Sequence, residues 1–228
     1  MNLSNSDLKL LESPERPERS YMDDPNIAWR GEKPDFTNVD LKYLREKQRS
    51  HGLESLEKIV ENLVKTWEME STHKACAEDW QTVARDDFQF IVNGQKPASL
   101  KETIERGNYN ILLNNCAFYN SKGTSNQESI DLFKGSFVSG FAWELDTLYS
   151  GPPKVVFSWR HWGHFDGAFG ENQPTGELIE LSGICVATVN KDLKIETLEI
   201  HYDPHPMLAT LKGIKSPCCH VDAASKNK

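Results

Sequence analysis

The sequence has no long hydrophobic run and no excess of positive charge. No stretch approaches the roughly 18 consecutive apolar residues of a membrane-spanning helix, so we expect no transmembrane segment. Lysine and arginine number 26 against 34 aspartates and glutamates, which gives a net charge of -8. Because nucleic-acid binding depends on the neutralisation of phosphates by basic residues, this balance argues against it. We therefore expect neither a membrane nor a nucleic acid as a partner.

Cysteine is scarce and shows no pairing pattern. The five cysteines include no Cys-x-x-Cys motif, and Cys218 and Cys219 stand side by side near the C-terminus. Residues 1–20 lack the apolar run of a signal peptide and contain the acidic residues that transit peptides avoid. These features predict a cytoplasmic protein with reduced thiols and no structural disulfide.

Motifs of several enzyme classes and of metal sites are missing as well. The chain contains no Gly-x-Gly-x-x-Gly, Gly-x-x-x-x-Gly-Lys-Ser/Thr, Gly-x-Ser-x-Gly or His-Glu-x-x-His, which disfavours the corresponding enzymes. His161 and His164 are three residues apart in an expected strand, so their side chains point to opposite faces and do not form a metal site. The triplet "CCH" at 218–220 has no second group of ligands. We expect no cofactor and no bound metal.

Polar residues gather at the two ends of the chain. Residues 1–52 contain four prolines and only short apolar islands, which predicts an extended N-terminal arm that docks on a folded body. Residues 53–206 have the regular hydrophobic patterns of one domain. Residues 207–228 demand little structure and are expected to be a flexible C-terminal tail.

The first half of the domain is predicted to be mainly helical. The strongest helix has one apolar face formed by Leu56, Ile59, Val60, Leu63, Val64 and Trp67. Ser99, followed three residues later by Glu102 and then by Gly107, predicts a short helix with a capping box and a glycine stop. Further helical turns are expected within residues 74–83, 107–115 and 128–137.

The second half of the domain has the alternating pattern of long strands. Residues 141–150 and 154–167, separated by Gly-Pro-Pro, predict one hairpin, and residues 176–190 and 193–203 predict another. A shorter strand is expected within residues 86–94, which end in Asn-Gly. Helices followed by long antiparallel strands indicate an α+β domain with a curved sheet wrapped on helices.

The register of the first hairpin decides which side chains share a face. With residues 151–153 as the turn, Trp143 faces His161 and Glu144 faces Arg160, which pairs opposite charges across the strands. One face then carries His161 among apolar side chains, and the alternation along residues 141–150 places Tyr149 on it as well. The apolar residues of this face are Phe141, Trp143, Leu145, Phe157, Trp159 and Phe165. This face suits an apolar cavity in which His161 is the polar group, although a hydrogen-bonded core histidine is the alternative. A shift of one residue would bring His164 and Asp166 into the cavity instead.

Several segments, in order along the chain, resemble the plant pathogen-related protein family. They are "EKIVENLVKTWEMESTHK", "GNYNILL", "DLFKGSF", "GFAWELDTLYSGPPKVVFSWRHWGHFDG", "PTGELIELSGICVATV" and "LEIHYDP". The resemblance implies a nuclear transport factor 2-like or SnoaL-like fold, which is a cone-shaped, strongly curved antiparallel sheet covered by N-terminal helices. It also implies cytosolic residence and expression linked to pathogen attack. It implies no reaction and no catalytic residues.

Three functions are compatible with these patterns. We favour a non-catalytic defence protein that binds a small apolar ligand in the cavity, through Trp67, Phe141, Trp143, Trp159 and His161. The first alternative is a cofactor-independent isomerase, cyclase or dehydratase in which His161 is the acid or base and Tyr149 or Tyr202 orients the substrate. The second is an interaction module that forms a homodimer through an exposed apolar patch around Trp162 and has no usable cavity.

Overall fold

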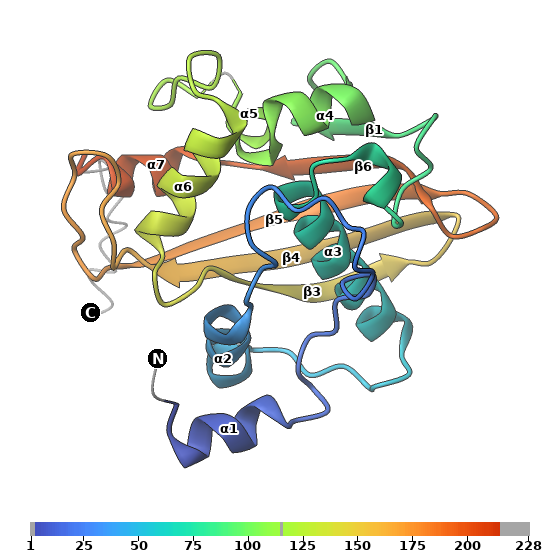
Figure 1. Cartoon of the computed structure of the whole chain (residues 1–228), viewed down its shortest axis with the longest axis horizontal. Helices are drawn as coiled ribbons and strands as arrows, with labels where there is room; N and C mark the ends of the chain where they lie inside the picture. Colours follow the sequence, from blue (N-terminus) through green and yellow to red (C-terminus); the bar gives the residue numbers. More distant parts are fainter. Residues whose placement is uncertain (1–2, 115, 215–228) are drawn as a thin grey trace, which may run out of the picture.

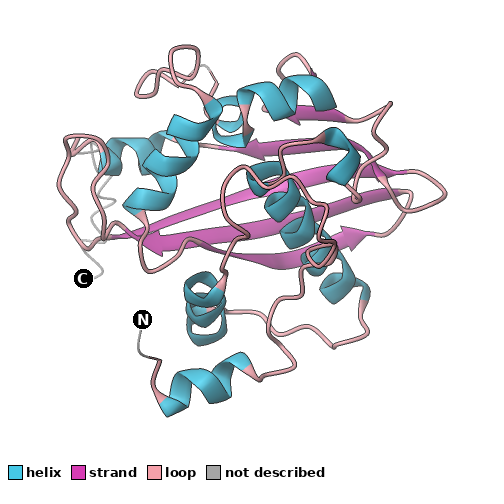
Figure 2. Cartoon of the chain, in the orientation of Figure 1, coloured by secondary structure: helices cyan, strands magenta, loops and turns pink. Residues whose placement is uncertain are grey.

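The computed structural model of the chain describes residues 3–114 and 116–214. Within these residues the strands form one six-stranded sheet in the order β2-β1-β6-β5-β4-β3 (Figures 1 and 2). The strands are β1 (Gln89–Val92), β2 (Ala98–Ser99), β3 (Ala142–Ser150), β4 (Lys154–His164), β5 (Leu178–Val189) and β6 (Ile195–Tyr202). The helices are α1 (Asn5–Leu11), α2 (Thr37–Glu46), α3 (Leu56–His73), η1 (Ala77–Asp79), α4 (Leu100–Arg106), α5 (Asn108–Leu112), α6 (Asn126–Ser136) and α7 (His205–Leu211). The fold class is α+β, as predicted; the strong curvature of the sheet stays a prediction.

The predicted helices of the domain are confirmed, with one exception. Helix α3 spans 18 residues and is capped at its N-terminus by Ser55, whose side chain accepts a hydrogen bond from the Lys58 amide. Helix α4 has the predicted capping box between Ser99 and Glu102. Over residues 74–83, however, only the short 3-10 turn η1 forms. The Glu70 carboxylate accepts the main-chain amides of Gln81 and Thr82 there, so this segment bonds to α3 instead of to itself.

Both predicted hairpins are present, but the sheet is not wholly antiparallel. β3 pairs with β4, and β5 pairs with β6, in antiparallel fashion. β1 lies parallel to β6, with Phe90 beside Leu198. The expectation of an antiparallel sheet was wrong at this pair, because β1 and β6 are distant in sequence and no tight turn sets their relative direction.

The predicted register of the first hairpin is confirmed near its open end and changes towards its turn. Trp143 lies opposite His161 and Glu144 lies opposite Arg160. A bulge between Leu145 and Thr147 then places Leu148 opposite Phe157. The extra residue turns Leu148 towards the core and leaves Tyr149 61% exposed.

The N-terminal residues are more ordered than the expected extended arm, because they form α1 and α2. Figure 1 shows both helices beyond β3 at the edge of the sheet. Helix α2 buries Tyr43 against Trp162 and Ala142, and the Trp162 indole donates a 2.9 Å hydrogen bond to Glu46. The apolar residues of α2 thus cover the sheet face opposite His161, which is why this segment folds as a helix.

The predicted flexible tail begins too early. Residues 207–211 belong to α7, which buries Met207, Leu208 and Leu211. These three residues lie on one helical face, and their burial in the main core gives the segment a reason to be ordered. Residues 215–228, with Cys218, Cys219 and the rest of the expected tail, lie outside the described residues. In the part of the chain that is described, no helix is long and apolar enough to cross a membrane.

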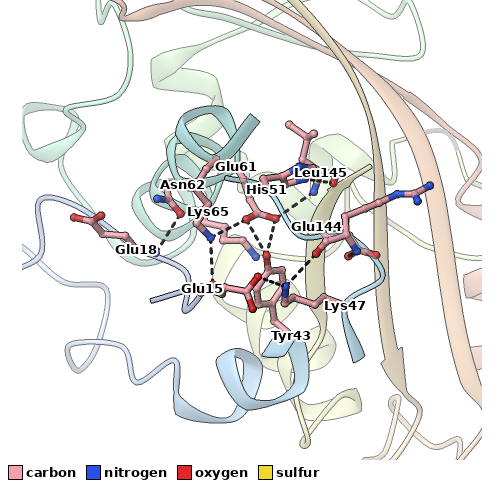
Figure 3. Close-up of polar contacts among 12 residues, drawn as sticks. Glu15, Glu18, Tyr43, Lys47, His51, Glu61, Asn62, Lys65, Glu144 and Leu145 are labelled. Atoms are coloured by element: carbon pink, nitrogen blue, oxygen red, sulfur yellow. Dashed lines mark hydrogen bonds and ion pairs between the residues drawn. The ribbon is translucent and has the colours of Figure 1, made fainter. Parts of the chain in front are cut away.

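A buried polar cluster ties α2, α3 and β3 together (Figure 3). The Tyr43 hydroxyl donates to both carboxylate oxygens of Glu61, at 3.1 and 2.9 Å, and Lys58 pairs with the same carboxylate at 3.1 Å. Lys65 donates to the main-chain carbonyl of Trp143. Buried polar groups are costly without partners, so these bonds hold α3 in one position over the sheet.

Candidate ligand-binding cavity

A cavity of about 130 Å³ lies between the helices and the sheet. Helices α3, α5, α6 and α7 and strands β3 to β6 contribute its wall, so it is built from segments spread over most of the domain. Its wall is mostly aromatic and aliphatic. The lining residues are Val64, Trp67, Glu68, Thr72, Asn108, Tyr109, Leu112, Leu113, Phe133, Phe141, Trp143, Phe157, Trp159, His161, Leu181, Cys185, Leu198, Ile200, Tyr202 and Met207.

The structure brings the predicted ligand-binding residues together around this cavity. All five line it: Trp67, Phe141, Trp143, Trp159 and His161. Strand alternation accounts for four of them, because 141 and 143 on one chain segment and 159 and 161 on its neighbour point to the same face. Trp67 approaches from the apolar stripe of α3.

Aromatic contacts hold the walls in place. The Trp143 ring meets Phe157 edge-on at 6.1 Å, and the Trp159 ring lies 5.7 Å from Tyr202. Gly183 of β5 makes room for Trp159: a Cβ atom at residue 183 would lie 2.5 Å from the indole ring and 2.5 Å from the His201 carbonyl oxygen. Only glycine lets the indole approach this strand so closely.

Two ionisable side chains face each other in the apolar wall. His161 Nε2 of β4 lies 3.8 Å from Glu68 Oε1 of α3, and the Glu68 side chain keeps 45% of its accessible surface. Burial by itself raises the pKa of Glu68, but the neighbouring His161, with Lys65 and Arg19, lowers it to a net value below the ordinary one. Glu68 is therefore ionised at neutral pH.

Sequence reasoning missed Glu68, although a signal was present. Val64, Trp67 and Glu68 stand at positions i, i+3 and i+4 of α3, so the apolar stripe that predicted Trp67 continues directly onto this carboxylate. A charged residue at the end of an apolar stripe is usually interpreted as a solvent-exposed residue at the edge of the buried helix face. Only the opposing His161 shows that it belongs to the cavity.

His161 is held by packing more than by hydrogen bonds. Its ring contacts Phe141 in a tilted arrangement with centroids 3.8 Å apart, and its Nδ1 atom is buried with no partner among the described residues. A lone pair is cheaper to bury unpaired than an N–H group, so we assign the proton to Nε2, which faces Glu68. This environment differs from that of a fully hydrogen-bonded core histidine.

The two tyrosines that line the cavity are neutral, and each has a contact within the protein. The Tyr202 hydroxyl donates a 3.0 Å hydrogen bond to the Leu112 carbonyl, and burial raises the pKa of Tyr202 well above its ordinary value. Tyr109 stacks on Phe133 at 4.6 Å, and burial likewise raises its pKa. Burial also raises the pKa of Cys185, so its thiol stays protonated and is a poor nucleophile.

The remaining candidate residues lie elsewhere. Tyr149 is on the outer face of the hairpin, where the bulge has turned it, and its hydroxyl contacts Ser158 at 3.3 Å. His164 Nδ1 lies 2.9 Å from the Lys42 ammonium on the outer face. Asp166 lies beyond the end of β4 and accepts the main-chain amides of Val138 and Ser139. His164 and Asp166 therefore form no dyad, because the strand ends between them.

Nothing in the described residues groups ligands for a metal ion. Within residues 3–114 and 116–214, no three histidine, cysteine, aspartate or glutamate side chains are placed to hold one. The triplet at 218–220 falls outside these ranges.

A comparison of whole sequences shows the family. No family model matches the chain. The pathogen-related protein of Hordeum vulgare is 33% identical over 205 residues, which cover 86% of each chain. The chain belongs to the pathogen-related protein family.

Solved structures similar to this pathogen-related protein are more distant. A putative SnoaL-like polyketide cyclase from a Jannaschia species is 12% identical, with a TM-score of 0.39 over 74% of this chain and 99% of its own. A putative polyketide cyclase from Acidithiobacillus ferrooxidans is 12% identical, with a TM-score of 0.40 over 72% and 100%. A protein from Catenulispora acidiphila with a ketosteroid isomerase-like fold is 9% identical, with a TM-score of 0.37 over 67% and 93%. Likenesses this low carry no conclusion about activity.

Proposed function

We propose that this pathogen-related protein binds a small apolar ligand in the cavity between α3 and the sheet. The observation that carries the proposal is a cavity of about 130 Å³ with a mainly aromatic and aliphatic wall. An apolar cavity of roughly 150 Å³ accepts benzene in another protein, so this one is suited to a ligand of about one ring. Small-molecule sites combine such a wall with a few polar groups, here Glu68 and His161.

The packing around the cavity supports the same proposal. Well-packed cores close such spaces, and Gly183 together with the fixed aromatic rings keeps this one open. A ligand of about one ring would contact the aromatic side chains that line this space.

A substitution that places a larger side chain in the cavity tests the proposal. Leu181→Phe adds a ring from a residue that lines the cavity, while Ile184→Phe adds the same ring on the exposed face of the same strand. Toluene binding is followed by NMR titration of the indole N–H signals of Trp67, Trp143 and Trp159. We expect binding in the wild type and in Ile184→Phe, and at least tenfold weaker binding in Leu181→Phe. Equal binding in both variants would place the ligand elsewhere.

A role in defence and a cytoplasmic location are also proposals. The relative in Hordeum vulgare is named a pathogen-related protein, which supports a rise in abundance upon infection. Quantitative mass spectrometry of infected and uninfected tissue tests the first point, and cell fractionation tests the second. Unchanged abundance after infection would contradict the defence role.

A second candidate function is cofactor-independent proton transfer by an isomerase, cyclase or dehydratase. The pairing of Glu68 with His161 inside an apolar cavity favours it, because one group can accept a proton while the other donates one. Turnover would appear as exchange of α-hydrogens for deuterium in a small cyclic ketone incubated in D₂O. Exchange by the wild type and its loss in Glu68→Gln would support the enzyme over the carrier.

The interaction module has less support. It requires an exposed apolar patch around Trp162, but α2 covers this residue and the cavity is present. A homodimer stays a prediction, and size-exclusion chromatography with light scattering tests it.

A further inference from the structure

We propose that the cavity selects small ring ligands that carry a neutral hydroxyl group, held between Glu68 and His161, and that it rejects carboxylates. This inference rests on the proposed function, because it concerns the ligand of the same cavity. It adds the chemical class of the ligand and the two atoms that recognise it.

The spacing of the two side chains fits one bridging oxygen. Glu68 Oε1 and His161 Nε2 are 3.8 Å apart, beyond the roughly 3.2 Å limit of a good direct hydrogen bond. A single oxygen atom at about 2.8 Å from each fits this gap with ordinary hydrogen-bond lengths. The two groups are therefore close enough to share one ligand atom and too far apart to satisfy each other.

The chemistry of the two groups determines what that atom must be. An ionised Glu68 only accepts hydrogen bonds, whereas the Nε2–H group of His161 donates one. The bridging atom must donate to the first and accept from the second. A hydroxyl group does both, while an ether oxygen only accepts and an ammonium group only donates.

The charge of Glu68 disfavours ligands that carry a carboxylate. A ligand carboxylate at this position would bring a second negative charge within hydrogen-bond distance of the Glu68 carboxylate, and two like charges so close repel each other. The rest of the wall suits a ring: Phe141 lies on His161, and Trp67 and Trp143 line the same cavity. The site is thus complementary to a phenol-like molecule.

Three probes of similar size and shape separate the contributions. Toluene carries no polar group, 4-methylphenol adds a hydroxyl, and 4-methylbenzoate adds a carboxylate. Affinities come from NMR titration of the full-length protein through the indole N–H signals. We expect the wild type to bind 4-methylphenol at least tenfold more tightly than toluene, because a hydrogen bond to a charged group is strong, and to bind 4-methylbenzoate most weakly.

Variants then assign the discrimination to the two side chains. Glu68→Gln removes the charge at nearly constant size, and His161→Phe removes the donor while keeping a ring. In Glu68→Gln the ratio of toluene affinity to 4-methylbenzoate affinity falls at least threefold. In both variants the affinity for 4-methylphenol falls towards the affinity for toluene. Glu105→Gln, an exposed residue of α4 outside the cavity, keeps all wild-type affinities.

The outcomes separate this inference from the proposed function. Equal binding of toluene and 4-methylphenol by the wild type overturns the hydroxyl preference and leaves the apolar cavity intact. Binding of 4-methylbenzoate as tight as that of 4-methylphenol overturns the role of the Glu68 charge. Failure of all three probes to bind overturns both proposals. The wild-type comparison needs no variant, so it decides the preference even if a substitution impairs folding.

Discussion

Lys65 of α3 donates a 2.5 Å hydrogen bond to the main-chain carbonyl of Trp143 in β3. The bond crosses from the helix to the strand directly behind the cavity wall, since the Trp143 side chain lines the cavity. The Lys65 ammonium also lies 4.0 Å from the centre of the Tyr43 ring. Burial lowers the pKa of Lys65 to about 8, although the Glu61 charge acts in the opposite direction.

Replacement of this lysine is expected to destabilise the fold. In Lys65→Met the Trp143 carbonyl loses its donor and Glu61 keeps only Lys58 as a nearby cation. We expect a loss of about 2–4 kcal/mol in the free energy of unfolding, as for other broken buried pairs. Urea denaturation measures it. Lys101→Met, at an 84% exposed side chain, should stay within about 0.5 kcal/mol of the wild type.

Stability should fall in mild acid because of His73. Burial, helped by the charge of Lys134, lowers the pKa of His73 to about 4 from an ordinary 6.5. The folded state therefore binds this proton more weakly than the unfolded state. The contribution of His73 to the free energy of unfolding is complete above pH 6.5 and is lost as the pH falls towards 4. The loss is on the order of 2–3 kcal/mol.

The measurement compares urea denaturation curves at several pH values between 7.5 and 4. In His73→Gln the loss of stability over this range should be smaller than in the wild type by about the amount given for His73. The control His205→Gln, at an exposed histidine, should follow the wild-type curve. Parallel curves for the wild type and His73→Gln would contradict the contribution of His73 to the acid transition.

A methyl group at residue 183 should deform the cavity. The added Cβ in Gly183→Ala would lie too close to both the Trp159 ring and the His201 carbonyl oxygen, so the indole must move into the cavity or the strand must shift. We expect a loss of about 1–3 kcal/mol in stability and at least tenfold weaker toluene binding. Gly31→Ala is the control, because a Cβ atom at residue 31 meets no atom within 4 Å, and it should bind toluene as the wild type does. Unchanged binding in Gly183→Ala would contradict the packing of Trp159 on β5.

The two candidate tyrosines should respond differently to loss of their hydroxyl groups. Tyr202→Phe leaves the Leu112 carbonyl without its donor, with an expected cost of about 1–2 kcal/mol. Tyr149→Phe changes an exposed position and should stay within about 0.5 kcal/mol of the wild type, with ligand affinity unaffected. Thermal and urea unfolding of the pair provide the comparison. A large effect of Tyr149→Phe on binding would contradict its placement outside the cavity.

The sequence by itself determined the features that depend on neighbouring residues. The capping box of Ser99 and Glu102 sets the start of α4 through atoms three residues apart. Alternation along residues 141–145 and 157–161 placed Trp143 opposite His161 and gathered the aromatic wall on one face. The apolar stripe that ends at Trp67 identified α3. Such patterns can be recognised because chain geometry repeats every two or 3.6 residues.

Only the tertiary structure decided the features that depend on packing between distant segments. The bulge after Leu145 turned Tyr149 away from the cavity, and nothing in the local alternation marks it. The parallel pairing of β1 with β6 and the cover of α2 over Trp162 join segments far apart along the chain. Glu68 and His161 also meet only because α3 packs against β4. Which side chains meet across a core depends on how helices and strands fill space together, and sequence periodicity carries no information about that distance.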